Sequence, residues 1–242
     1  MSNGQTPTTA EVRKKAFDII QQLNSKLCVD FRIRDTSAEL YGKNIEIASG
    51  YDHPKTASDN PIITIIASEH QSLDDAEKSL KHEVYGRYAL NTHSPRDKGE
   101  LLKKIIASKN EPSLKETWTF IETWHPNATP ERQAEEVFAT IAESHDPAKN
   151  KSLRQSRSLA QSSRKTLTAE DLNNEINCLA EGIASGIRTL KTTANEQAET
   201  QQDTTKTFID NLSSWRQKNA SRAEEVETSS VDFSPSWRSS AN

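Results

Sequence analysis

Hydrophobic and polar residues alternate with two different periods in the first seventy positions. Apolar residues three and four apart predict an amphipathic helix over residues 9–24. Residues 27–33 alternate apolar with polar, which predicts a strand with one buried face, and residues 43–47 predict a weaker second strand. Residues 61–67 form the most apolar run, rich in β-branched side chains, and predict a central strand. The helix therefore has a small sheet to cover.

Beyond residue 70 the pattern changes to successive short helices, each with a start signal. A hydroxyl side chain that can cap a helix precedes every predicted segment: Ser72, Ser94, Ser113, Thr129 and Thr168. Proline follows two of these caps directly, as is favoured at the first helical position. A small sheet packed with helices is an α+β fold.

Composition limits how much of the chain belongs to one core. Only 33% of the 242 residues are apolar and the mean hydropathy is -0.81, which suits one domain with polar extensions. We expect a disordered leader at residues 1–8 and a folded domain at residues 9–146. A basic polar linker should follow at residues 147–167, then an amphipathic helix at residues 168–197 and a low-complexity, mostly disordered tail at residues 198–242.

For the segments after residue 146, the sequence is compatible with more than one packing partner. Residues 149–167 carry basic but no acidic side chains, and we interpret them as a solvated linker. The stripe of the next helix recurs by threes and fours and must be covered: Leu172, Ile176, Leu179, Ile183, Ile187 and Leu190. Packing on the same domain is the default interpretation. Pairing with a second copy, or binding a protein or peptide partner through residues 168–190, remains open.

Charge and cysteine usage narrow the cellular setting. Cys28 and Cys178 lie far apart, so a disulfide framework is not expected and a reducing compartment fits. The net charge of -4 gives no reason to expect specific nucleic-acid or membrane binding. No secretory signal and no membrane-length apolar run is visible in the sequence. We expect a cytoplasmic protein, with non-Sec secretion left open.

The candidate chemistry lies in one helix, at His82-Glu83-Val-Tyr-Gly86-Arg87-Tyr88. Two histidines that bind one zinc ion from a regular helix are four residues apart, but Gly86 occupies that position. A spacing of five turns the second side chain away by roughly 140° unless a π-type turn absorbs one residue. We expect Gly86 to ease such a turn.

This stretch resembles the His-Glu-x-x-Gly-His signature of dipeptidyl peptidase III and of zincin-like domains in phage and plasmid proteins. It departs from the signature at the second ligand, now Arg87, and at a later glycine, now Ala89. The Glu135-Glu136 pair resembles the downstream helix that supplies the last carboxylate ligand in those families. The resemblance implies a minimal zincin fold with His82 and Glu136 as metal ligands, Glu135 as an alternate carboxylate, and Glu83 as general base.

Arg87 breaks this scheme because a guanidinium stays protonated and has no lone pair to give a metal. Its charge would also repel the ion. We therefore expect no cofactor, with zinc only if the site is still competent. As a hypothesis, Arg87 pairs with the carboxylate of Glu136 or Glu83 in place of the metal.

Four other histidines do not complete the set. His93 lies three turns after His82, roughly 16 Å away by helical rise, which is too far to share an ion. We interpret His93, together with His70, His125 and His145, as surface or loop histidines.

Three hypotheses for function follow. The first is a degenerate zincin-like protein, bacterial and linked to a mobile element by the resemblance alone, that acts in binding or regulation. The second is an active zinc peptidase with a non-standard ligand set. The third is a partner-binding or secreted adaptor that works through its C-terminal helix and tail.

Overall fold

The computed structural model describes residues 6–24, 26–43, 47–56, 59–146, 159–188 and 190. The chain divides into two compact units, residues 1–197 and 198–242, and all described residues belong to the first. The predicted leader over residues 1–5, part of the linker and the whole tail from residue 198 lie outside the described residues. Among the described residues, no helix is both long and apolar enough to cross a membrane.

A three-stranded mixed sheet confirms the α+β prediction. Strands β1 (Asp30–Arg34) and β3 (Ile62–Ile66) are parallel, β2 (Ser49–Asp52) is antiparallel to β3, and β3 is central as predicted. The observed β2 begins at Ser49, so placing the second strand at residues 43–47 was wrong for the described positions 43 and 47. Residues 44–46 lie outside the described residues.

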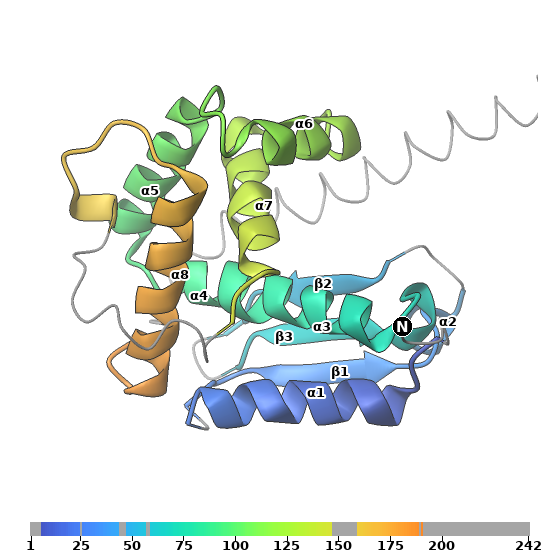
Figure 1. Ribbon diagram of the computed structural model, residues 1–242. Helices are drawn as coiled ribbons and strands as arrows, with labels where there is room; N and C mark the ends of the chain where they lie inside the picture. Colours follow the sequence, from blue (N-terminus) through green and yellow to red (C-terminus); the bar gives the residue numbers. More distant parts are fainter. Residues whose placement is uncertain are drawn as a thin grey trace, which may run out of the picture. The chain divides into compact units, whose positions relative to one another are not determined.

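Helices α1 (Thr9–Gln22) and α3 (Leu73–Lys81) pack against each other and against the sheet (Figure 1). Thr8 caps α1 through a reciprocal capping box with Glu11. Ser72 caps α3 as predicted, accepting a hydrogen bond from the Asp75 amide. Short helix α2 (Ala38–Tyr41) and 3₁₀ turn η1 (Ala67–Glu69) complete this part of the domain. The sheet and these helices fix the direction in which α3 enters the candidate site.

The chain runs from α3 without a break into π-helix η2 (His82–Tyr88) and the short helix α4 (Ala89–Asn91). Helices α5 (Pro95–Ala107), α6 (Lys115–Trp124) and α7 (Pro130–Ala142) follow. The predicted caps Ser94 and Thr129 are confirmed, whereas α6 begins two residues after Ser113 with Leu114 at its cap. Helices α5 and α6 both pack on α7, which in turn packs on η2 (Figure 1).

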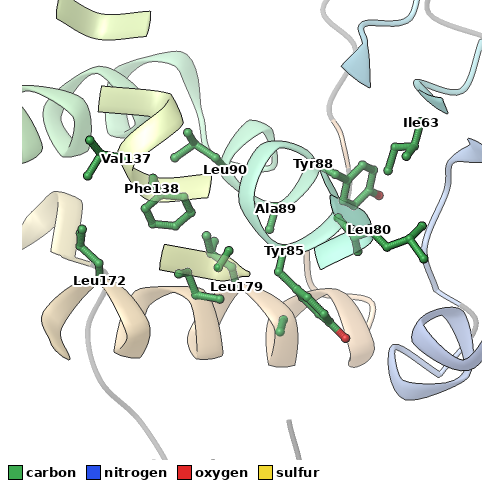
Figure 2. Packing of buried hydrophobic residues seen from close by; sticks show 14 of the residues in the cluster. Ile63, Leu80, Tyr85, Tyr88, Ala89, Leu90, Val137, Phe138, Leu172 and Leu179 are labelled. Carbon is green, nitrogen blue, oxygen red and sulfur yellow. The ribbon is translucent and has the colours of Figure 1, made fainter. Parts of the chain in front are cut away.

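Helix α8 (Ala169–Ala184) packs on the domain rather than projecting from it. Its stripe contacts α7, α4 and η2, and four of its apolar side chains are fully buried: Leu172, Ile176, Leu179 and Ile183. Figure 2 shows Leu172 and Leu179 beside Phe138, while Leu80 and Tyr88 lie toward Ile63 of the sheet. The default interpretation of intramolecular packing is confirmed for these residues.

The segment just before α8 is attached to α5. The 3₁₀ turn η3 (Leu159–Gln161) lies against α5, and Leu167 is fully buried. The ammonium group of Lys104 donates to the carbonyls of Leu159, Ala160 and Ser162 at 2.5 to 2.9 Å. The interpretation of a solvated linker was therefore wrong for Ala160 and Leu167, which are buried, whereas residues 163–166 are exposed as expected.

Candidate functional site

The π-helix η2 places His82 and Arg87 on a common face. The helix has π-type winding over His82–Tyr88, which takes up one more residue than a regular helical turn. Side chains five positions apart therefore lie on the same face. Gly86 lies where this helix crosses α7: a Cβ there would be 2.6 Å from both Cα and Cβ of Ala139. Only glycine permits this approach. Gly86 thus allows the close crossing that brings η2 and the Glu136 side chain of α7 together.

Arg87 joins the two carboxylates that the sequence had singled out. Its Nη2 lies 2.5 Å from Glu136 Oε1, and its Nε lies 3.3 Å from Glu83 Oε2. Glu83 and Glu136 are 1% and 3% exposed, so each carboxylate has lost most of its hydration. The hypothesis that Arg87 pairs with Glu136 or Glu83 is confirmed for Glu136 by a hydrogen bond, whereas the Glu83 contact is an ion pair without a hydrogen bond.

His82 lies between two carboxylates. Its Nε2 is 3.2 Å from Glu136 Oε2, and its Nδ1 is 2.9 Å from Glu143 Oε1. Burial disfavours the imidazolium, but the hydrogen bonds to Glu136 and Glu143 outweigh it and raise the pKa of His82 to about 9. Both ring nitrogens therefore carry protons at neutral pH, and neither offers a lone pair.

The carboxylate of Glu136 is held in its ionised form. Burial alone would raise its pKa, but the charge of Arg87 and the hydrogen bond from His82 lower it far below its usual range. The charges of Glu136 and Glu83 raise the pKa of Arg87 above its already high value, although burial acts in the opposite direction. We call the set His82, Glu83, Arg87 and Glu136 the Arg87 cluster.

Neighbouring residues complete the neutralisation. Lys98 Nζ lies 2.5 Å from Glu135 Oε1, and Arg132 reaches Glu135 at 2.9 Å and Glu136 at 3.1 Å. The Ser49 hydroxyl of β2 donates to Glu83 Oε1 at 2.7 Å. The site contains four carboxylates, from Glu83, Glu135, Glu136 and Glu143. When His82 is protonated, it also contains four cationic groups, from His82, Arg87, Lys98 and Arg132. The site has no excess negative charge to attract a cation.

The predicted site residues meet, but they do not fit a zinc ion. Glu136 is engaged by Arg87, both His82 nitrogens face carboxylates, and a guanidinium lies where a second imidazole is needed. Among the described residues, no group of three or more His, Cys, Asp or Glu side chains is arranged to hold a metal. Glu135 lies beside the cluster on Lys98, and the Tyr88 ring is buried in the core.

Four residues of the site were not singled out from the sequence. Glu143 lies seven residues after Glu136 on α7, and Arg132 lies four before it, so helical spacing could have found both. Lys98 is one turn into α5, and Ser49 begins an edge strand. Nothing in the sequence around either residue indicates that it reaches the site.

A second buried cluster contains the same residue types. His93 Nε2 lies 3.2 Å from Glu175 Oε1 of α8, and Arg188 Nη1 lies 3.4 Å from His93 Nδ1. We call these three residues the His93 cluster. Glu175 also accepts a hydrogen bond from the Leu159 amide at 2.7 Å, so the cluster fastens η3 and the end of α8.

The interpretation of the other histidines as surface or loop residues is confirmed, but three of the loop histidines are buried rather than exposed. His70, His93 and His145 lie between elements, as expected of loop histidines, but all three are buried. His70 bonds the Ile66 carbonyl and the Ser79 hydroxyl. Burial, followed by the charge of Lys81, lowers the pKa of His145 to about 4. His125 is exposed, as expected.

Comparison with known proteins gives one informative match. No family model matches the chain, and no solved structure matches it. The chain is 27% identical over 199 residues to DNA primase TraC of Escherichia coli. That match covers 75% of this chain and 14% of the primase. The chain is therefore similar to a small part of a much longer protein.

Proposed function

We propose that this chain is a zincin-like domain in which an ion-pair network has taken the place of the metal site, and that it acts in binding or regulation. The observation that carries the proposal is the position of Arg87. Its guanidinium bridges the carboxylates of Glu83 and Glu136, the two groups expected to serve as base and ligand. A π-turn that serves a five-residue ligand spacing is retained although the second ligand is absent.

Peptide hydrolysis by this site would need groups that are already engaged. A zinc-bound water requires an open coordination position and a carboxylate that can accept its proton. Glu83 instead accepts a hydrogen bond from Ser49 and lies beside the Arg87 guanidinium. The buried ion pairs leave the site charge-balanced and favour a structural role for it.

The biological setting is part of the same proposal. We place the protein in the bacterial cytoplasm in association with a mobile element, on the strength of the resemblance to zincin-like domains of phage and plasmid proteins. The similarity to part of a DNA primase supports a setting in DNA processing. A protein or peptide is the partner we favour, since the net charge is -4. A partner contact within residues 168–190 would use exposed positions such as Ile187, because the main stripe is buried.

Substitution of Arg87 by His tests the proposal directly. Arg87→His removes the cation and supplies an imidazole five residues after His82 on the π-helix. We expect the variant to bind zinc at near-stoichiometric level, measured by elemental analysis and by calorimetric titration, and the unmodified protein to bind none. Arg87→Leu is the matched control, because it removes the same charge without adding a ligand.

Each other outcome has a defined meaning. Zinc bound by the unmodified protein and lost in His82→Ala would overturn the proposal in favour of an active peptidase with another ligand set. No zinc in Arg87→His, with circular dichroism unchanged, would mean that these positions do not form a replaced metal site. Zinc in Arg87→His that His82→Ala abolishes would support the proposed geometry.

A further inference from the structure

Helix α6 exposes a second apolar stripe opposite its buried one. Its inner face buries Leu114, Trp118 and Ile121 against the domain. On its outer face, Phe120 is 51% exposed and Trp124 is 69% exposed, with ring centroids 6.0 Å apart. These two aromatic residues lie in one shallow hollow on the α6 surface. Adjacent exposed aromatic side chains on one helix face mark an interaction surface.

The polar residues of this stripe add to its apolar character. The Thr119 hydroxyl donates to the Lys115 carbonyl, and the Thr123 hydroxyl donates to the Thr119 carbonyl. Both hydroxyls are thus satisfied within the helix, so the threonine methyl groups are free to contribute apolar surface. The outer stripe of α6 consists of six exposed residues: Lys115, Glu116, Thr119, Phe120, Thr123 and Trp124.

We propose that this stripe is the contact surface for a second copy of the same chain, with the two α6 helices antiparallel about a two-fold axis between positions 119 and 120. Two-fold symmetry requires a surface that is complementary to itself. Antiparallel pairing about this axis sets Lys115 of one copy opposite Trp124 of the other. It also sets Glu116 opposite Thr123 and Thr119 opposite Phe120.

The charges of the stripe suit this arrangement. Lys115 of each copy meets an exposed indole face, where a cation is attracted to the ring, and lies at the negative end of the partner helix. Parallel pairing would instead bring Lys115 against Lys115 and Glu116 against Glu116. A nucleic-acid strand stacking on the rings would meet the Glu116 carboxylate, which repels phosphate. The antiparallel second copy is the occupant that places Lys115 on an indole ring and keeps like charges apart.

Cysteine cross-linking tests the geometry in the full chain. In a Cys28→Ser background, Thr119→Cys places a thiol next to the proposed axis, where it should form a disulfide-linked dimer on mild oxidation. Lys115→Cys is the matched control, because its two copies lie about 14 Å apart along the helix axis in antiparallel pairing. The Cys28→Ser parent, which keeps Cys178, gives the background. Equal cross-linking at both positions, or more at position 115, would overturn the antiparallel arrangement.

Sedimentation velocity over a concentration series tests the association itself. We expect a weak dimer, since one helix face buries less than the roughly 1,200 Å² of stable interfaces. Trp124→Ser with Phe120→Ser should abolish it, Lys115→Glu should weaken it about tenfold, and Lys115→Arg should retain it. A chain that stays monomeric at the highest concentration, or a dimer unaffected by the aromatic substitutions, would overturn the proposal.

Discussion

The Arg87 cluster and the His93 cluster contain the same three residue types but arrange them differently. In the first, both ring nitrogens of His82 face carboxylates, and Arg87 binds the carboxylate Glu136. In the second, only one nitrogen of His93 faces a carboxylate, and Arg188 approaches the other nitrogen. Arginine can only donate, so the Arg188 guanidinium presents a donor to Nδ1 of His93, while Nε2 lies 3.2 Å from Glu175 Oε1.

This difference shows that composition alone does not define the role of a buried histidine. His82 is an imidazolium inside a network of balanced charges, whereas His93 lies between Glu175 of α8 and Arg188 of the chain that follows α8. Arg87 is held between two buried carboxylates, while Arg188 is half-buried and contacts a ring. Only the first cluster has the geometry expected of a replaced metal site.

The largest expected difference between the clusters comes from removing each arginine. Arg87→Met leaves Glu83 and Glu136 buried beside too little positive charge, so we expect the free energy of unfolding to fall by about 3 to 5 kcal/mol. Arg188→Met removes a half-buried cation that lies 3.4 Å from the His93 ring and should cost no more than about 1 kcal/mol. Urea unfolding followed by circular dichroism measures both.

A second substitution separates charge from packing at Arg87. If the loss arises from unpaired carboxylates, Glu136→Gln should restore part of the stability of Arg87→Met. If Arg87→Met and Arg188→Met cost the same, the two clusters do not differ in the way described here. If Glu136→Gln makes the Arg87→Met protein still less stable, unpaired charge is not the cause of the loss.

The sequence predicted the first cluster much better than the second. The resemblance to a five-residue ligand spacing led to the expectation of a π-type turn eased by Gly86, and the structure has a π-helix over His82–Tyr88. The pairing of Arg87 with Glu136 or Glu83 was a hypothesis based on the arginine at the expected second ligand position, and the structure has the Arg87–Glu136 pair. Most helix caps were also predictable, because a capping residue acts on amides only two or three positions away.

The second cluster depends on contacts that no local pattern encodes. Glu175 meets His93 only because α8 packs back on the domain, and the sequence left pairing of α8 with another chain open beside this default. The burial of Ala160 and Leu167 among basic residues escaped prediction for the same reason. Ser49 reaches Glu83 across the sheet edge, and its neighbours in sequence carry no signal for that contact.

The two clusters also differ in how closely their backbones approach. A Cβ on Gly86 would meet backbone and Cβ of Ala139 at 2.6 Å, which only a shift of a whole helix can relieve. A Cβ on Gly182 would meet the flexible side chain of Arg188 at 2.7 Å. We expect Gly86→Ala to lower the free energy of unfolding by about 3 kcal/mol. Gly182→Ala should be nearly neutral, because alanine's better helix propensity offsets the displaced arginine.

Gly99→Ala in α5 provides the control for helix propensity, since nothing lies within 4 Å of a Cβ there. It should stabilise the protein by about 0.5 to 1 kcal/mol in the same urea experiment. A neutral Gly86→Ala would show that α7 can move away from η2, and the close crossing would then not fix the site. A large loss in Gly182→Ala would show that Arg188 is as rigidly held as Arg87.

At the site of the Arg87 cluster, the smallest expected effect is the pH dependence that His82 contributes. Its pKa is raised from 6.5 to about 9 in the folded protein, so its stabilising contribution is complete below pH 6.5 and is lost as the pH rises to 9. One pKa unit corresponds to about 1.4 kcal/mol, so the partly exposed group should contribute roughly 2 to 3 kcal/mol. Unfolding free energies of the unmodified protein and of His82→Gln, measured across this range, should converge as the pH rises.

The comparison with His82→Gln isolates this contribution from that of other histidines. Burial, followed by the charge of Lys98, lowers the pKa of His53 to about 4, and the pKa of His145 is lowered to about 4 as well. These two groups therefore stabilise the fold above pH 6.5 and cost stability as the pH falls toward 4, the opposite direction. They are present in both proteins and cancel in the difference. A difference that stays constant from pH 6.5 to 9 would mean that His82 is not held as an imidazolium between Glu136 and Glu143.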